Sequence, residues 1–412
     1  MDDLRRDVRP FDPDAPLAGA PDPWESAPMP APRNGPPWAM TEMIAAEPAL
    51  ARRIVERLAG DGSAQALAQA IRDAASRGES VVVTGCGTSE HAAQGVAEIL
   101  REAWRTAGLP GAGPAAAQAF ELAQDPPRSG LVIGVSHEGG STATIAALDA
   151  ARAAGARTAL LTASAGSPVA GSADIVLATV ELDSGWCHTV GYVSPMIAAA
   201  TIADRLAGRA TDGTALATRL ADGIDAAHGF SAFTGTRPDR GIAGWLADVR
   251  TLLVVGSGVD RVAARELVLK VEEAAWVPSA MRDLETFLHG HLPSTGADTG
   301  LVVLLTDPAA RPARIARARQ ALAAAAVVGV RSAGILAADV SAAIPDSLTP
   351  AGRIVLPEAP GLAGPVAALL GTAGPLQLLT LAIAAVRGTS PDQIRRDDPR
   401  YLRAAAVADE PG

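Results

Sequence analysis

The stretch SVVVTGCGTSEHAAQGVAEIL, residues 80–100, decides the fold. A short β-branched run ends in a glycine-rich turn and leads directly into a helical pattern. The same order follows at residues 131–155, where LVIGV is succeeded by SHEGGST and a second helical segment. Further strand patterns occupy 158–162 and 175–180. This alternation predicts an α/β fold with a parallel sheet covered by helices on both faces.

The pattern then recurs. GCGTSEHAAQGVAEIL at 85–100 is echoed by GSGVDRVAARELVLKV at 256–271, and SGLVIGVS at 129–136 is echoed by TGLVVLLT at 299–306. Two matches at nearly one offset indicate an internal duplication. We therefore expect two tandem three-layer αβα lobes of the flavodoxin-like kind. The expected organisation is a disordered Pro-rich arm (1–38), a first domain (39–228), a second domain (229–390) and a C-terminal tail (391–412).

Composition narrows the class of protein. Apolar residues make up 48% of the chain, enough for two buried cores, and the net charge is -10. An acidic surface argues against nucleic acid or an anionic membrane as the main partner. We find no membrane span or signal peptide in the pattern, and two cysteines make no disulfide framework. A cytoplasmic protein is the expectation.

Two loops stand where ligands bind in open parallel sheets, beyond the carboxyl ends of strands. Their glycines, hydroxyls and helix N-termini suit a phosphate or a polyhydroxyl ligand, although the same residues also make ordinary helix caps. We call them the first anchoring loop (85–89) and the second anchoring loop (136–142). The candidate ligand-binding residues are Gly87, Thr88 and Ser89 in the first, and Ser136, His137, Glu138, Ser141 and Thr142 in the second.

A charged stripe marks the second lobe. Glu266, Lys270 and Glu273 are spaced i, i+4, i+7 and share one face of an otherwise apolar helix. Such a stripe can be a solvated surface, but Lys270 is the only lysine in the sequence, which favours an active site. His289 and His291 follow; no Asp, Glu or Cys constellation supports a metal there, and we expect neither metal nor cofactor.

These blocks together resemble the sugar isomerase (SIS) family. The most specific block is ELVLKVEEAAWVPSAMRDLETFLHG at 266–290, with TEMIAAEPALARRI, GCGTS, SHEGGST and PLQLL…RG…PRYL in support, over roughly residues 41–409. The likeness is strongest to double-domain members: the isomerase half of glucosamine-6-phosphate synthase, and stand-alone amino-sugar-phosphate deaminases and ketose/aldose isomerases. No catalytic cysteine follows Met1, so glutaminase activity is not expected.

The resemblance implies roles residue by residue. Thr88, Ser89, Ser136 and Ser141 match hydroxyls that hold a sugar phosphate. Glu273 matches the carboxylate that moves a proton between C1 and C2 through an enediolate or enolamine, with Glu266 and Lys270 as its charged neighbours. His289 matches the ring-opening acid/base, usually lent by the partner subunit of a homodimer. The chemistry agrees, because a carboxylate can serve both carbons and histidine titrates near neutrality.

Two positions depart from the family pattern. Glu138 stands where the family usually has serine, and a carboxylate beside a phosphate is unfavourable. It either turns away, is compensated by His137, His91 or an arginine, or binds a sugar hydroxyl or amine. At the tail, Ala404 replaces the family's lysine, and the adjacent Arg403 cannot form a Schiff base.

One more loop, WCHTVGY at 186–192, follows the last strand of the first lobe. The family places ligand contacts there, so His188 joins the candidates, although an aromatic anchor would explain the loop equally well. Three functions remain open at this point. They are a sugar-phosphate isomerase or deaminase, a non-catalytic sugar-phosphate-binding protein, and an isomerase of an unphosphorylated sugar.

Overall fold

Two five-stranded parallel sheets form the framework of the computed structural model, which describes residues 11–27, 29–228 and 241–408. The first sheet has the order β2-β1-β3-β4-β5 and the second β10-β9-β8-β6-β7. The strands of the first sheet are β1 (Val81–Gly85), β2 (Ala115–Gln118), β3 (Leu131–Val135), β4 (Arg157–Thr162) and β5 (Ile175–Ala178). Those of the second are β6 (Thr251–Gly256), β7 (Ser279–Asp283), β8 (Thr299–Leu305), β9 (Arg331–Ala337) and β10 (Gly352–Leu356).

Read from its β7 edge, the second sheet repeats the strand order of the first. The predicted α/β class with two lobes of parallel sheet is therefore confirmed. The strands are long apolar runs because helices cover both faces. Every residue of β3 and of β8 is buried.

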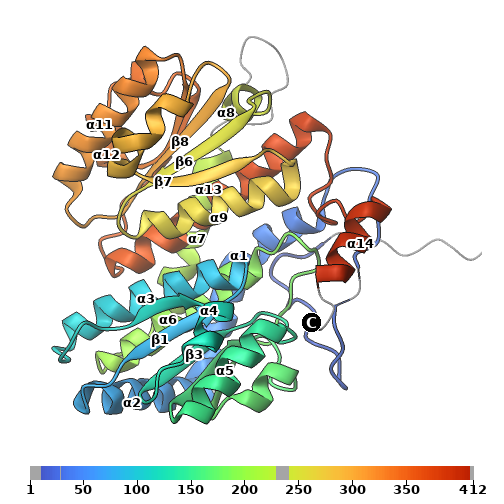
Figure 1. The fold of residues 1–412 in the computed structure, drawn as a ribbon, viewed down its shortest axis with the longest axis vertical. Helices are drawn as coiled ribbons and strands as arrows, with labels where there is room; N and C mark the ends of the chain where they lie inside the picture. Colours follow the sequence, from blue (N-terminus) through green and yellow to red (C-terminus); the bar gives the residue numbers. More distant parts are fainter. Residues whose placement is uncertain (1–10, 28, 229–240, 409–412) are drawn as a thin grey trace, which may run out of the picture.

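Helices connect the strands and cover the sheets (Figure 1). The first half of the chain contributes α1 (Ala39–Gly60), α2 (Ser63–Ser76), α3 (Thr88–Thr106), α4 (Ala119–Gln124), α5 (Thr142–Ala154), α6 (Val190–Leu206) and α7 (Gly213–His228). The second half contributes α8 (Gly241–Leu246), α9 (Asp260–Ala275), α10 (Leu284–Thr286), α11 (Arg311–Val327), α12 (Ala338–Ala343), α13 (Gly364–Arg387) and α14 (Pro399–Ala408).

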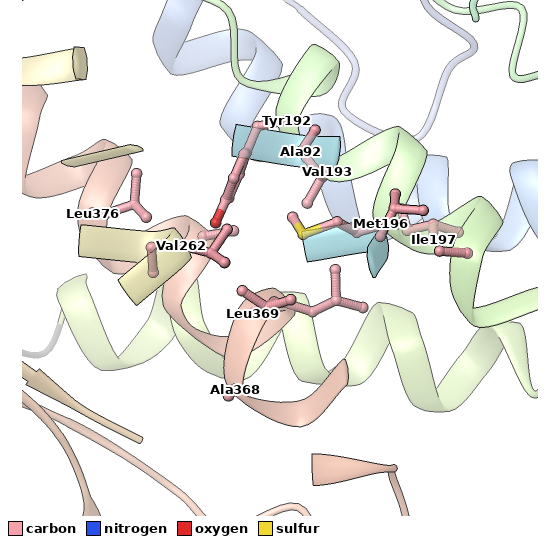
Figure 2. Packing of buried hydrophobic residues seen from close by; sticks show 14 of the residues in the cluster. Ala92, Tyr192, Val193, Met196, Ile197, Val262, Ala368, Leu369 and Leu376 are labelled. Atoms are coloured by element: carbon pink, nitrogen blue, oxygen red, sulfur yellow. The ribbon is translucent and has the colours of Figure 1, made fainter. Parts of the chain in front are cut away.

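The two lobes share one apolar core. Helices α3 and α6 of the first lobe face α9 and α13 of the second, and one continuous cluster of buried side chains runs through all four. Figure 2 shows Met196 of α6 beside Leu369 of α13, with Val262 of α9 nearby. Each such fully buried side chain stabilises the fold by about 1.5–3 kcal/mol. The lobes therefore hold one another in a fixed relation.

Helix α13 lies at the centre of this core. By length and apolar composition it would be able to cross a membrane, which the sequence analysis overlooked. Its most apolar window is wholly buried inside the protein, as expected for a core helix between two sheets.

The described part of the N-terminal arm contacts the first lobe. Residues 11–27 and 29–38 contain no helix, yet they lie against the first lobe through specific hydrogen bonds. The Leu17 N–H donates to the Glu181 carboxylate (2.9 Å), and the Trp24 indole donates to the Glu138 carbonyl (3.0 Å). These contacts lie between the described part of the arm and the first lobe, and the disorder expected of the arm stays a prediction. The expected domain boundary at residue 229 falls in 229–240, outside the described residues.

The C-terminal tail returns to the middle of the molecule. The Asp392 carboxylate accepts the N–H groups of Ala39 (3.0 Å) and Met40 (3.1 Å) at the start of α1. The Asp392 carbonyl accepts the N–H of Trp186 (2.8 Å). The tail thus ties the first helix to the loop that follows β5.

The contact between α7 and α13 gives a test of this packing. A Cβ on Gly223 would lie 2.4 Å from the Gly371 carbonyl oxygen, a backbone atom that cannot move aside. We expect Gly223→Ala to lower the free energy of unfolding by about 1–3 kcal/mol, measured by urea denaturation. In the helical control Gly60→Ala the new methyl meets nothing within 4 Å, and stability should hold or rise slightly. Equal effects of the two variants would contradict the packing.

Candidate active site

The two anchoring loops meet at the topological switch point of the first sheet. The strand order reverses between β1 and β3, so the connections leave these neighbours in opposite directions. The carboxyl ends of such neighbours are the usual ligand-binding position in open parallel sheets. The first loop turns sharply into α3: Gly87 has φ +58°, and a Cβ on Gly85 would lie 2.5 Å from the Ser89 carbonyl oxygen. Thr88 is buried at the first turn of α3.

The second anchoring loop is equally constrained. Ser136 is buried, and its N–H donates to the Leu161 carbonyl of β4 (3.0 Å). Gly139 has φ +86°, and a Cβ there would overlap the Ser167 side chain. Ser141 immediately precedes α5, and its hydroxyl accepts a hydrogen bond from the Thr144 hydroxyl (3.2 Å). Thr142, also a candidate, is exposed on the first turn of α5.

His137 points into the protein interior rather than standing open to solvent. Its Nε2 accepts a hydrogen bond from the N–H of Asp183 (3.0 Å), and burial lowers its pKa. The Asp183 carboxylate in turn accepts N–H groups at the start of α6, from Val190 (3.0 Å) and Gly191 (2.8 Å). Burial acts to raise the Asp183 pKa, but His137, His188 and the N–H groups of Thr189 and Gly191 lower it overall. A fixed anion therefore lies behind the second loop.

Glu138 and His188 face each other across the loop. Glu138 Oε1 lies 3.7 Å from His188 Nε2, and the side chains are 22% and 23% exposed. The His188 ring lies 5.4 Å from the His137 ring, centre to centre. Burial lowers the pKa of His188 to about 4, and the positive charges of Lys270 and Arg396 act in the same direction. His188 is thus neutral at physiological pH.

The charged stripe of α9 forms a buried cluster between the lobes. Lys270 is fully buried, with Nζ 2.6 Å from Glu273 Oε2 and 3.7 Å from Glu266 Oε1. Glu266 Oε2 lies 2.8 Å from Nδ1 of His91 on α3, which belongs to the other lobe. Burial opposes the charge on Lys270, but Glu273, Cys187 and Glu266 raise its pKa above the ordinary value. Lys270 therefore remains an ammonium ion.

The loop after β5 connects the two halves of the site. Burial raises the pKa of the Cys187 thiol, and Lys270, Glu273 and Glu266 all act on it, which places Cys187 beside the cluster. The next residue, His188, faces Glu138 of the second anchoring loop. This loop thus lies between the charged cluster of α9 and the second anchoring loop.

His289 does not join this cluster within the described chain. Its side chain is 70% exposed, and Nε2 lies 2.9 Å from Glu285 Oε1, a carboxylate that also binds Arg317. The role that the family resemblance implies for His289, in a partner subunit's site, stays a prediction. Over residues 11–27, 29–228 and 241–408, no group of three or more His, Cys, Asp or Glu side chains is arranged to hold a metal ion.

Sequence reasoning missed several members of the site. His91 appeared only as a possible compensating charge, and Asp183 was not singled out, although it lies three residues before the WCHTVGY loop. The tail contributes two stacked guanidinium groups. Arg396 lies 4.0 Å from the Trp186 ring, and Arg395 lies 4.5 Å from the Trp276 ring. No local pattern marks such contacts, because their partners are about 120 to 210 residues away.

The comparisons with known proteins agree with this fold. A model of the SIS domain family matches residues 75–201, which lie in the first lobe. The second sheet repeats the strand order of the first and is consistent with a second lobe of the same kind.

The chain is similar in sequence to a glutamine–fructose-6-phosphate aminotransferase (isomerizing) of Streptomyces coelicolor, with 27% identity over 77% of this chain and 51% of that protein. It thus spans about half the length of that relative. The C-terminal domain of glucosamine-fructose-6-phosphate aminotransferase from Francisella tularensis superposes with a TM-score of 0.71 at 17% identity, over 88% of this chain and all of that one. Tagatose-6-phosphate ketose/aldose isomerase from Escherichia coli gives 0.66 at 20%, over 89% and 97%.

Removing the ammonium from the cluster tests its electrostatics. We expect Lys270→Met to lower the free energy of unfolding by about 3–5 kcal/mol, because Glu266 would remain buried with too little positive charge. Chemical denaturation measures the change. In the matched control, Arg261→Met on the same helix, the lost ion pair with Asp283 is exposed and should contribute at most about 1 kcal/mol. Similar losses in both variants would show that Lys270 is not held as described.

Proposed function

We propose that this protein is an aldose–ketose isomerase or isomerising deaminase of a phosphorylated hexose or amino hexose. The single observation that carries the proposal is Glu273, a partly exposed carboxylate held 2.6 Å from the fully buried ammonium of Lys270. The SIS match and the named activities of the similar proteins support the substrate class. We further propose a homodimer in which His289 of the partner subunit reaches this site.

The proposed chemistry needs one base that serves two adjacent carbons. Glu273 takes the proton from one carbon and returns it to the other, through an enediolate or, for an amino sugar, an enolamine. Lys270, fixed on its buried stem, stabilises the negative oxygen that develops between these steps. The ammonium also lies near Glu266, and the Glu266 carboxylate is paired with His91. In the anchoring loops, Thr88, Ser89, Ser136 and Ser141 would orient the far end of the sugar.

Glu273→Gln tests the proton transfer. We expect the variant to lose at least about 100-fold in the exchange of the C1 or C2 proton with deuterated solvent, followed by NMR on hexose and hexosamine 6-phosphates, because an amide cannot accept the proton. Glu272→Gln is the matched control, because the Glu272 carboxylate is exposed and should be dispensable for exchange. Intact exchange in Glu273→Gln would exclude the proposed role. Sugar-phosphate binding without exchange in the wild type would instead favour a non-catalytic binding protein.

A second candidate function rests on Glu138. This carboxylate lies in the second anchoring loop. Its titratable partner is His188, which is neutral at physiological pH. A phosphate placed there would meet a negative charge that no described arginine or lysine pairs. In an isomerase of an unphosphorylated sugar, the Glu138 carboxylate would instead accept a hydrogen bond from a sugar hydroxyl.

Glu138→Ser separates the two substrate classes. If the natural substrate is unphosphorylated, we expect the variant to favour phosphorylated sugar more than the wild type does. The kcat/KM for free sugar divided by that for phosphorylated sugar should fall by about tenfold or more, because a hydroxyl donor replaces a charge that repels phosphate. Steady-state kinetics on paired substrates measure this ratio. If the ratio stays fixed, Glu138 does not face the ligand and the second candidate loses its support.

A further inference from the structure

We infer that Glu47 and Gln377 form an acid–amide pair that joins the two lobes through two hydrogen bonds and weakens when the acid loses its proton. Glu47 lies on α1 of the first lobe, and Gln377 lies on α13 of the second. Their exposed fractions are 0% and 1%. The pair therefore lies inside the shared core, and the proposed sugar chemistry does not use it.

One proton satisfies two oxygen atoms that otherwise lack partners. Gln377 Nε2 donates to Glu47 Oε1 (2.8 Å). Glu47 Oε2 and Gln377 Oε1 are also buried, and the described part of the chain offers neither of them a hydrogen-bond partner. Carboxylate and amide oxygens can only accept, so an ionised Glu47 leaves both atoms unsatisfied, whichever way the amide is turned. A proton on Oε2 can instead donate to Gln377 Oε1 and close a ring of two hydrogen bonds.

The elements packed around Glu47 also favour the neutral acid. Burial raises the pKa of Glu47 well above its ordinary value; the Gln377 hydrogen bond lowers it, and the negative charge of Asp183 before α6 raises it further. On α6 the Tyr192 hydroxyl is buried, and the charge of Glu47 is among the causes that raise its pKa. The buried cation of α7, Arg219, donates to backbone carbonyls instead. Neither α2 nor any other described element supplies a cation that acts on Glu47.

The proton makes the contact between the lobes sensitive to pH. In the unfolded chain Glu47 loses its proton near the ordinary glutamate pKa of 4.5, whereas the folded protein retains it to higher pH. The folded state then binds one proton more than the unfolded state. The contribution of Glu47 to stability is therefore complete below about pH 4.5 and declines as the pH rises toward the pKa of the folded state. Once ionised, the carboxylate meets the Gln377 oxygen and the charge of Asp183, and α1 is held less firmly to α13.

Glu47→Gln tests the proton, because two amides can form the same ring of two hydrogen bonds without it. Urea denaturation of the full chain gives the unfolding equilibrium constants of wild type and variant between about pH 5.5 and about pH 7.5. The wild-type constant divided by the variant constant should rise by about tenfold per pH unit, because only wild-type Glu47 releases a proton on unfolding. Glu56→Gln is the matched control. It removes an exposed carboxylate from the same helix, and its ratio should change by less than about twofold over the same range.

Infrared spectroscopy gives a second readout that needs only the wild-type protein. When the glutamate side-chain carboxyl carbons carry carbon-13, a neutral acid shows an isotope-shifted C=O stretch at neutral pH, to which aspartate does not contribute. Glu47→Gln should remove this band. A pH-independent ratio for Glu47→Gln, or a labelled wild-type spectrum with carboxylate bands alone, would overturn the inference. If Glu47→Gln does not fold, the wild-type spectrum decides by itself.

Discussion

The contact between His91, Glu266 and Lys270 is the constraint on which the site depends. It joins α3 of the first lobe to α9 of the second inside a low-dielectric core, where a lone charge would be unfavourable by several kcal/mol. The continuous apolar cluster through α3, α6, α9 and α13 fixes the lobes, and the charge cluster fixes the registry of their facing helices. The Lys270 ammonium lies between Glu266, which is buried, and Glu273, which is the more accessible carboxylate.

The two lobes have the same topology but differ at their strand ends. In the first lobe the turns after β1 and β3 carry hydroxyls, among them Thr88 and Ser136. In the second lobe carboxylates fill the same places: Asp260 accepts the N–H (2.8 Å) and the hydroxyl of Thr306, and Asp307 accepts the N–H of Val259 (3.1 Å). These donors of the second lobe are therefore taken by side chains of the protein itself. Under the proposed function, the first lobe would hold the sugar and the second would supply the reacting helix.

Much of this arrangement was predictable from local pattern. The strand–glycine–helix units at residues 80–100 and 251–275 specify parallel sheets, and the i, i+4, i+7 spacing puts Glu266, Lys270 and Glu273 on one face of α9. Other features were not predictable. The contacts of the Pro-rich arm are one example, because Trp24 and Leu17 meet Glu138 and Glu181, which lie more than 100 residues away in the sequence. His91 and Asp183 carry no motif, and only the packing of the lobes gives them partners.

By itself, the sequence determined the class of fold, the duplication and the identity of the charged helix, because helix and strand periodicities and glycine turns are local properties of the chain. Only the tertiary structure decided which charges share a buried space. It made Lys270 an ammonium between two carboxylates and kept His188 neutral opposite Glu138, because desolvation and Coulomb energy depend on distances that sequence spacing does not set.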